Sequence, residues 1–415
     1  MVVERMNKEI ETKLSIIKLG KIPRNYKRHN RDLLPLDWKS VKIEEVMNIK
    51  NNYRVPISES KRKTIQGIYP YYGPTKIQDY IDRYTLEGEH VLIGEDGDHF
   101  LKYKEKKMTL LVSGKFNVNN HAHIIQGTKL CDTKWFYYVF QHKNILDSVT
   151  RQGVGRYKLT KGALRNIEFS LPKLSEQQNI IRILEVWDKS IDLKEKLLQQ
   201  KQKQKKGLMQ RLLTGKIRLK GFKDKWDTVK LGSAIDVIKK ESLSNPQEYN
   251  LLTVKLHVKG IEATDKKPNT TEKGRPYYLR EPGELLIGRQ NFHNGGIGIV
   301  PQDMKGYIAS NAITSLKVIN EDLKFYFHYL SNSSFYKRVD NIIGGTGQKE
   351  ISETMLKKLK VKVPRNINEQ RAIAKVISVA DYEVKLLEKE IELLKEQKKG
   401  LMQLLLTGIV RVKCD

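Results

Sequence analysis

Four polar loops that contain glycine carry the side chains with the clearest chemistry in this sequence. They span residues 94–99, 151–158, 288–295 and 344–349 and are rich in Arg, Lys, Asn and Gln. These side chains pair with the edges of DNA bases, and glycine lets the backbone approach phosphates. Ordinary turn chemistry explains any single residue equally well. Taken as a set in a basic chain, the loops favour contact with DNA.

The candidate DNA-contacting residues lie in these loops or in neighbouring turns. They share a polar or aromatic side chain that can reach a base edge or a phosphate. They are Tyr72, Lys76, His99, Lys115, Arg151, Gln152, Arg156, Lys158, Lys259, Arg275, Arg289, Gln290, Asn291, Asn294, Gln348 and Lys349. We predict no catalytic residue among them.

The first of these loops also contains possible metal ligands. Asp96, Asp98 and His99 have the donor atoms that metal ions bind. The corresponding loop of the second half offers Gln290 and Phe292 instead. Because the second loop cannot repeat the ligand set, we expect no metal site in this chain.

Motifs for catalysis on DNA are absent from the sequence. There is no Gly-x-x-x-x-Gly-Lys-Ser/Thr loop for a nucleoside triphosphate. There is also no Asn/Asp-Pro-Pro-aromatic tetrapeptide of the kind that amino-methyltransferases use, since residues 245–249 read Asn-Pro-Gln-Glu-Tyr. We therefore expect a chain without catalytic activity or a cofactor of its own.

An internal repeat organises the elements that must position the loops. Residues 205–215 (KKGLMQRLLTG) recur as residues 398–408 (KKGLMQLLLTG), an offset of 193 with one difference. Glu176-Gln177 matches Glu369-Gln370 at the same offset. The chain therefore has two equivalent halves, and a duplicated protein usually meets a duplicated or bipartite target.

Each half is predicted to end in a long helix. Ser175, in a capping box with Gln178, and Asn368 are the predicted N-caps. No proline follows for about 40 residues, or roughly 60 Å of helix. Apolar residues then recur in steps of four and three, at Ile373, Ile377, Ala380, Val384, Leu387, Ile391 and Leu394.

This spacing is typical of a coiled-coil seam. Lys194 and Lys201 interrupt the matching seam of the first helix, so the two helices are complementary. We predict an antiparallel pair within the chain, with packing in a homodimer as the weaker alternative.

The repeated helix starts and ends are candidate partner-binding segments. Gly207 and Gly400 each cost about 1 kcal/mol of helix stability against alanine, which indicates a bend or a close approach by another backbone. The apolar residues that follow them suit a core or a docking surface equally well. The candidates are Gln177, Trp187, Gly207, Leu208, Met209, Leu212, Gln370, Gly400, Leu401, Met402 and Leu405.

The sequence divides into five segments. Residues 1–37 form an N-terminal extension, 38–172 and 221–364 form two domains, and 173–220 and 365–415 form two helical regions. Each domain mixes short β-like runs with one aromatic-rich helix and is predicted to be α+β. We expect strands at 69–74, 89–94, 119–125, 284–288 and 307–313, and helices at 134–146 and 323–330.

A short N-terminal match suggests a circular layout. Leu19-Gly20-Lys21-Ile22 resembles residues 214–217, and each precedes a tryptophan, Trp38 or Trp226. The C-terminal copy at 407–410 is followed by no third domain. We therefore expect a pseudo-twofold repeat in which the two ends of the chain lie close together.

The composition favours a polyanionic partner. Lys and Arg number 77 against 48 Asp and Glu, for a formal net charge of +29, which most often indicates nucleic acid. Cys131 and Cys414 are too few for a disulfide framework or a structural zinc site and fit a reducing cytoplasm. We expect neither a signal peptide nor a membrane-spanning segment.

These features together resemble the specificity subunit of type I restriction-modification systems. The marks are the paired helix starts, Pro172 with Glu176-Gln177 and Pro364 with Glu369-Gln370, and the paired helix ends. The resemblance runs from Trp38 to Lys413. It implies two target-recognition domains separated by two long antiparallel coiled-coil helices.

The resemblance also implies that the chain is not catalytic and positions other subunits. These would be two methyltransferase subunits and, in the full complex, ATP-dependent translocating endonuclease subunits. S-adenosylmethionine, ATP and Mg²⁺ would then belong to the partners, and this chain would bind double-stranded DNA.

Two hypotheses remain at this point. The first is a non-catalytic subunit that reads a bipartite asymmetric target, with the helices holding two readers about one duplex turn, or about 34 Å, apart. The second is a sequence-specific nuclease or methyltransferase-fused enzyme, with Glu95-Asp96 at its catalytic site. Incubating the purified protein with DNA and Mg²⁺ distinguishes them.

Overall fold

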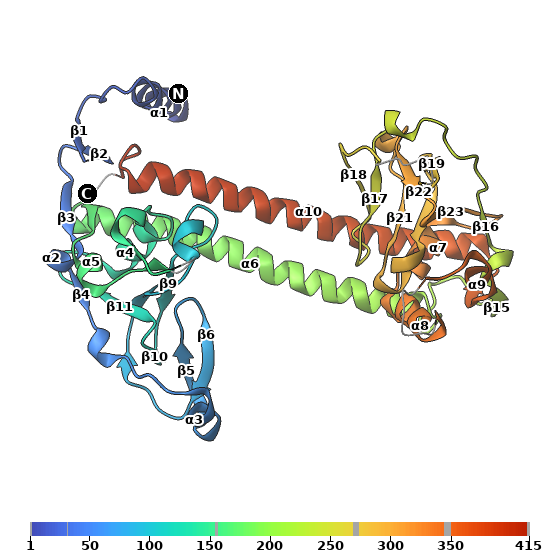
Figure 1. Cartoon of the computed structure of the whole chain (residues 1–415), viewed down its shortest axis with the longest axis horizontal. Coiled ribbons are helices and arrows are strands. Elements are labelled where there is room, and N and C mark those ends of the chain that lie inside the picture. Colours follow the sequence, from blue (N-terminus) through green and yellow to red (C-terminus); the bar gives the residue numbers. More distant parts are fainter. Residues whose placement is uncertain (1, 31, 154–156, 269–273, 344–349, 413–415) are drawn as a thin grey trace. The chain divides into compact units, whose positions relative to one another are not determined.

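The computed structural model describes residues 2–30, 32–153, 157–268, 274–343 and 350–412 (Figure 1). They form two compact units. Unit 1 comprises Met1–Leu193 and Ile391–Asp415, and unit 2 comprises Lys194–Glu390. Each unit contains one mixed domain and a section of each of two long helices, which are α6 (Leu174–Leu212) and α10 (Ile367–Leu406).

Unit 1 is built around two four-stranded sheets. The central sheet has the order β4-β11-β8-β9, and its neighbouring strands are all antiparallel. The second sheet has the order β6-β5-β10-β7. Their bounds are β4 (Met47–Ile49), β5 (Gln66–Tyr72), β6 (Ile77–Ile81), β7 (Leu86–Glu87), β8 (His90–Gly94), β9 (Thr109–Val112), β10 (Lys115–Val118) and β11 (Ala122–Gly127).

Shorter elements complete unit 1. The paired strands are β1 (Tyr26–His29) with β2 (Asp32–Pro35), β3 (Lys39–Lys42) with β14 (Glu168–Leu171), and β12 (Thr150–Arg151) with β13 (Tyr157–Lys158). The helices are α1 (Val2–Lys18), α2 (Ile43–Val46), α3 (Glu59–Thr64), α4 (Thr133–Phe140) and α5 (Lys161–Arg165), with 3₁₀ turns η1 (Asn51–Tyr53), η2 (His99–Lys102) and η3 (Leu146–Ser148).

Unit 2 repeats the central sheet in the order β16-β23-β20-β21. Its strands are β15 (Trp226–Lys230) with β24 (Lys360–Pro364), β16 (Ile235–Val237), β20 (Leu285–Gly288), β21 (Ile297–Ile299), β23 (Ile313–Val318), β17 (Leu252–Val254) with β18 (Ile261–Ala263), and β19 (Tyr277–Leu279) with β22 (Ile308–Ser310). Its helices are α7 (Leu323–Leu330), α8 (Ser333–Ile343) and α9 (Glu353–Lys358), with η4 (Leu231–Ser233), η5 (Pro246–Glu248), η6 (Arg289–Asn294) and η7 (Gln302–Met304).

A tryptophan anchors the aromatic-rich helix in each core. Trp38 and Trp135 are fully buried and meet edge to face, with ring centroids 5.8 Å apart. Trp226 and Phe325 make the equivalent edge-to-face contact at 6.4 Å in unit 2. Such pairs add about 0.5–1.5 kcal/mol beyond the area they bury, so both domains use the same anchor.

The two long helices pack as an antiparallel pair. In unit 1 the Lys398 ammonium lies 2.5 Å from the Asp188 carboxylate, and in unit 2 Lys205 pairs with Asp381. Residue numbers therefore rise along α6 as they fall along α10. Seam residues are buried as predicted, including Ile180, Leu184, Ile191, Ile373, Ile377, Val384 and Ile391.

The lysines that interrupt the seam are paired across it. Lys194 lies 2.8 Å from Glu390, and Lys201 lies 2.8 Å from Glu383. An ion pair between half-exposed side chains adds little stability. It does favour one register of the two helices, which matches the prediction of a complementary pair.

Three predicted boundaries are wrong. Helix α6 begins at Leu174, so Ser175 lies inside its first turn, and in α10 the side chain of Asn366 accepts the Asn368 backbone N–H at 2.9 Å. Helix α4 ends at Phe140, before the predicted limit of 146. There the Gln141 carbonyl accepts a bond from the Met108 backbone and not from a following helical turn.

The strand predictions are largely confirmed, with two differences. The run at 119–125 begins its strand, β11, only at Ala122, because Asn119 and Asn120 belong to the preceding turn. The run at 307–313 is divided between β22 and the start of β23. The helix predicted at 323–330 coincides with α7. Within the described residues, no helix is long and apolar enough to cross a membrane.

The C-terminal arm packs onto the start of the chain within unit 1. Gly20, Gly215 and Gly408 end α1, α6 and α10 with positive φ angles of 73°, 68° and 70°, which is the left-handed helix end that glycine favours. The Tyr26 hydroxyl donates to the Gly408 carbonyl at 2.7 Å, and the Lys13 ammonium donates to the Ile409 carbonyl at 3.1 Å. These contacts confirm the circular organisation.

Candidate nucleic-acid interface

In unit 1 the loop after β8 lies beside the β12–β13 hairpin. The Gly97 N–H donates to the Tyr157 carbonyl at 3.0 Å, and the Leu159 N–H donates to the Glu95 carbonyl at 2.8 Å. The structure thus brings together two of the polar loops that the sequence singles out, although about 60 residues separate them.

The charges of these two loops are partly neutralised by each other. Glu95 accepts a hydrogen bond from Arg54 at 2.6 Å and lies 3.5 Å from the Lys158 ammonium. Asp96 lies 3.1 Å from the His121 ring. Sequence reasoning missed Arg54, because nothing in a distant segment marks it as the partner of Glu95.

His99 fills the inside of the first loop. Its ring lies 4.0 Å from that of Phe100, and burial lowers its pKa. Gly94 needs to be glycine, because a Cβ there would lie 2.7 Å from the His99 ring and 3.3 Å from Pro74. This closeness also places the turn between β5 and β6 beside the loop.

The three possible metal ligands do not converge. Asp98 pairs with Lys102 at 2.6 Å, while Asp96 faces His121. Across the described part of the chain there is no group of three or more His, Cys, Asp or Glu side chains that could hold a metal ion.

Unit 2 repeats the arrangement with different side chains. The Ile351 N–H donates to the Arg289 carbonyl at 3.1 Å, as Leu159 does to Glu95 in unit 1. The β17–β18 turn joins the same loop, since the His257 N–H donates to the Asn294 carbonyl at 2.8 Å.

The polar side chains of this second loop make few internal bonds. Arg289 pairs with Glu350 at 2.9 Å, and the Asn294 amide lies 3.0 Å from the His293 ring. Asn291 is exposed to solvent.

The remaining candidates fall into three groups. Exposed side chains are Lys76, Lys115, Arg151, Gln152, Lys259, Arg275 and Asn291. Partly buried ones are Tyr72, His99, Lys158, Arg289, Gln290 and Asn294. Arg156, Gln348 and Lys349 lie outside the described residues.

Not all of the candidates cluster. Tyr72 pairs in the sheet with Val118, and the Lys76 turn follows it, so both lie near the first loop. Lys115 is at the opposite end of β10, with its ammonium 4.7 Å from the centre of the Tyr84 ring. The structure therefore separates Lys115 from the other unit 1 candidates.

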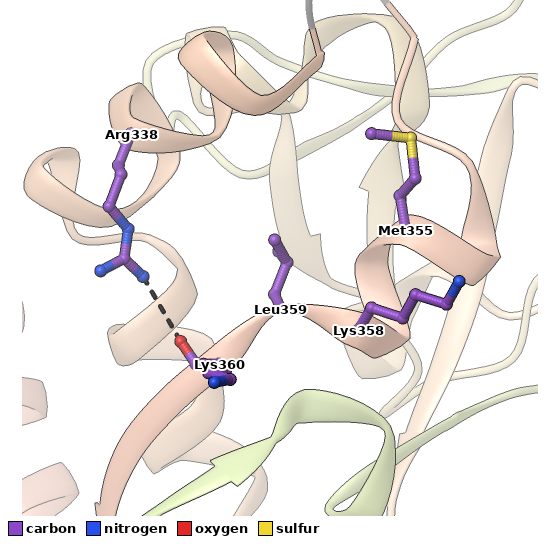
Figure 2. Close-up of a pocket in the computed structure, with 5 residues that line it drawn as sticks. All are labelled: Arg338, Met355, Lys358, Leu359 and Lys360. Carbon is purple, nitrogen blue, oxygen red and sulfur yellow. Dashed lines mark hydrogen bonds between the residues drawn. The ribbon is translucent and has the colours of Figure 1, made fainter.

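A basic hollow of about 410 Å³ lies on the surface of unit 2 (Figure 2). Its lining residues are Arg338, Met355, Lys358, Leu359 and Lys360, with no acidic side chain among them. Figure 2 shows the Arg338 guanidinium directed at the Lys360 carbonyl, to which it donates at 3.4 Å. Sequence reasoning missed this hollow, whose charge suits a phosphate group.

The sequence model of the Type I restriction modification DNA specificity domain matches this chain twice, at residues 35–201 and 223–396. The chain belongs to this family. A type I restriction enzyme specificity subunit of Haemophilus influenzae is 39% identical over 150 residues, which are 36% of this chain and 37% of that protein.

Longer matches come from other relatives. The specificity subunit of the type I enzyme MjaVIII from Methanocaldococcus jannaschii is 24% identical over 94% of this chain and 96% of its own length. The crystal structure of a type I S subunit from M. genitalium has a TM-score of 0.62 at 17% identity and covers 92% of this chain and 98% of that one. That likeness supports the fold of two recognition domains and two packed helices.

In this specificity subunit a clamp of Trp, Glu and Arg fixes the start of each long helix. In unit 1 the Glu176 carboxylate accepts from the Trp38 indole at 3.0 Å and from Arg411 at 2.7 Å. Arg411 also donates to Asp37 at 2.7 Å, and the bond to Glu176 raises the pKa of Arg411. The C-terminal arm thus completes the clamp of the first domain.

The clamp of unit 2 has the same parts. Glu369 accepts from Arg218 at 2.6 Å and from the Trp226 indole at 3.3 Å. Arg218 and Arg411 are themselves 193 positions apart. Extending the repeat past its identical block would have found both arginines.

The paired glutamines of the specificity subunit have a structural role. Gln177 accepts the Asp132 N–H at 2.9 Å and donates to the Pro172 carbonyl at 3.0 Å. Gln370 accepts the Asp322 N–H at 3.0 Å. Both are fully buried, so they tie the helix starts to the domains and present no surface to a partner.

Most of the repeated helix ends also belong to the core. Leu212, Met402 and Leu405 are buried, while Trp187, Leu208, Met209 and Leu401 are partly buried. A Cβ on Gly207 or Gly400 would meet nothing within 4 Å in the described chain. The expectation of a close backbone approach there is therefore wrong for contacts within this chain.

Proposed function

We propose that this specificity subunit reads a bipartite, asymmetric DNA target without catalysing a reaction itself. Unit 1 reads one half-site and unit 2 reads the other. The observation that carries the proposal is the repeated loop arrangement after β8 and β20, in which equivalent backbone bonds position different side chains. Equivalent placement gives each domain the same approach to a groove, and different side chains give different sequences.

The charge of the chain supplies affinity. The net charge of +29 and the exposed basic residues around both loops suit contacts to phosphates, which fix register without reading sequence. Binding should therefore weaken steeply as salt rises.

Two copies of a methyltransferase subunit are the proposed partners. A second apolar line runs along the solvent side of each long helix at steps of seven, and we call these lines the outer stripes. They are Val186, Leu193 and Gly207 on α6, and Val379, Leu386 and Gly400 on α10, at an offset of 193.

The outer stripes have the spacing that a partner helix would recognise. Val186 and Val379 are 64% and 53% exposed, which is unusual for apolar residues at heptad spacing. The glycines in the same line leave room for another backbone. S-adenosylmethionine, ATP and Mg²⁺ would be bound by the methyltransferase and translocating endonuclease subunits, in a complex that works in the cytoplasm.

Methylome sequencing tests the recognition function. Cells that carry this chain and its methyltransferase should show one methylated bipartite motif, with two dissimilar half-sites and an unspecified gap. Cells with the methyltransferase alone should lack that motif. An unchanged methylome after removal of this chain would refute the proposal.

The alternative of an enzyme is tested separately. The pure chain, incubated with duplex DNA and Mg²⁺, should neither cut nor methylate it. Turnover that disappears in Asp96→Ala would establish the enzyme instead, because Asp96 lies in the loop that an active site would use.

A further inference from the structure

Two cavities occupy equivalent places in the two units. One of about 620 Å³ lies in unit 1 beside the end of α4, and one of about 640 Å³ lies in unit 2 beside the end of α7. The repeated helix segment lines both. Lys398, Lys399 and Met402 face the first cavity, and their counterparts 193 positions earlier face the second.

An ion pair between the long helices forms part of each wall. In unit 1 Asp188 pairs with Lys398 at 2.5 Å and accepts from the Tyr138 hydroxyl at 2.9 Å. In unit 2 Asp381 pairs with Lys205 and lies 3.6 Å from the His328 ring. The counterpart of Tyr138 is thus His328, and both are buried.

Each cavity wall also contains a buried polar group without a hydrogen-bond partner. In unit 1 it is Gln141, which is fully buried and whose amide nitrogen and oxygen are both unpaired in the described structure. In unit 2 it is the hydroxyl of Ser331, which is 6% exposed. Each stands three residues after the Tyr138 or His328 position. Buried polar groups are nearly always paired, so unpaired groups at equivalent positions of both cavities indicate that each cavity receives a polar ligand.

The chemistry of the walls describes that occupant. Apolar side chains such as Met402 and Leu406 in unit 1, and Met209 and Val384 in unit 2, line the interior. Lysines outnumber carboxylates around both rims. An occupant with an apolar side chain and carboxylates would satisfy both, whereas a DNA phosphate would leave the apolar part exposed.

We propose that the two cavities are twin sockets, each of which receives an acidic segment with an apolar anchor from one of two copies of the same partner subunit. The duplication requires an occupant that comes twice. Lys399 and Lys206 adjoin Gly400 and Gly207 of the outer stripes, so one partner molecule could cover a stripe and fill the neighbouring socket. The identity of the partner as the methyltransferase subunit rests on the proposed function.

Charge reversal at the socket rims tests the proposal in the complete chain. The variants are Lys399→Glu for unit 1, Lys206→Glu for unit 2, and both together. Lys389→Glu and Lys203→Glu are the matched controls, since these exposed lysines lie on the same helices and line neither cavity. Native mass spectrometry of each chain mixed with methyltransferase subunit counts the partners bound.

Each single socket variant should bind one partner normally and the second at least about tenfold more weakly. The double variant should lose both, and the controls should keep two. Two partners on every variant would overturn the sockets while leaving the proposed function intact. A wild-type chain that binds no methyltransferase subunit would overturn both.

Two further measurements distinguish an acidic partner segment from a DNA phosphate and from a purely structural role of the cavities. The affinity of the free chain for duplex DNA, measured against salt, should change equally in socket and control variants. A smaller salt slope only in the socket variants, with two partners still bound, would assign the cavities to phosphates. Gln141→Met should raise the melting temperature of unit 1 and weaken binding of one partner, and a rise without weaker binding would contradict the proposal.

Discussion

The two units share a frame and differ in what the frame carries. Both have the same four-strand order in the central sheet, the same clamp at the helix start and the same glutamine tie. Unit 1 adds a second four-stranded sheet, whereas unit 2 has two separate two-stranded pairs in its place. The shared parts all contact the long helices, so helix pairing restricts them, and the parts away from the helices are free to diverge.

The interiors show the same divergence at one matched position. In unit 2 Glu284 accepts from Ser315 at 2.7 Å and pairs with Lys240 at 2.5 Å. Ser315 in turn accepts from Arg280, whose burial lowers its pKa to about 10. The counterpart of Glu284 in unit 1 is His90, which is fully buried edge-on to an aromatic ring. A difference this deep supports two readers with unrelated targets.

Exchange of one domain tests that independence most strongly. Residues 231–359, replaced by those of a relative, leave β15, β24 and the clamp of unit 2 in place. The methylated motif should then change completely in one half-site and not in the other. The reciprocal exchange of residues 43–167 should change the opposite half, and a change in both halves after either exchange would contradict separate readers.

The gap between the half-sites should depend on the shared helices. Four residues add about 6 Å of helix, close to two base pairs at 3.4 Å each. Because Lys201 pairs with Glu383, insertions after Gln200 and after Leu386 lengthen both helices near the same level. The methylated motif should keep both half-sites and gain one or two unspecified base pairs.

A matched insertion separates helix length from added chain length. Four residues after Lys223 lengthen only the exposed segment between α6 and β15 and should leave the gap unchanged. An unchanged gap in the helix variant as well would mean that partner subunits set the spacing.

The clamps allow the two units to be compared by stability. Glu176→Ala leaves the Trp38 indole and Arg411 without their buried acceptor and should destabilise unit 1 by about 2–4 kcal/mol. Glu369→Ala should cost unit 2 a similar amount. Hydrogen exchange of each unit measures the loss locally.

Only the unit 1 variant should also release the C-terminal arm, because Arg411 follows the last helix whereas Arg218 lies within a continuous chain. Limited proteolysis should therefore remove the arm faster in Glu176→Ala than in Glu369→Ala. Equal protection in both variants would mean that the Tyr26 and Lys13 contacts hold the arm by themselves.

The long helices and the repeat could be predicted from sequence because their signals are local and periodic. Steps of four and three from Ile373 to Leu394 define the seam, and the offset of 193 pairs the halves. The cap positions failed by one or two residues, since Ser175 and Asn366 differ from the other polar residues nearby only in backbone geometry.

The site was only partly predictable. The loops after Gly94 and Gly288 could be found by composition, and the structure shows that each is bonded to a distant segment. Partners such as Arg54 are invisible in sequence, because a contact across 41 positions leaves no periodic trace. The twin cavities depend on how α4 and α7 end against the long helices, which no local pattern describes.

The smallest expected difference between the units concerns pH. His328 of unit 2 is buried, with Nε2 3.0 Å from the Ser378 hydroxyl, and burial lowers its pKa to about 4. Asp381 opposes that shift and Lys205 adds to it. The folded pKa lies below the unfolded value of about 6.5. His328 therefore contributes stability that is complete above pH 6.5 and is lost as the pH falls toward 4.

At pH 5 this loss amounts to about 2 kcal/mol for unit 2. His328→Tyr, which gives unit 2 the residue that unit 1 has at Tyr138, should make hydrogen exchange of unit 2 less sensitive to pH between 7.5 and 5 by that amount. Burial raises the pKa of Tyr138, so the hydroxyl stays neutral over this range and unit 1 provides the internal reference. If the wild type and the variant lose protection in parallel as the pH falls, carboxylates elsewhere in unit 2 govern its acid sensitivity and His328 does not.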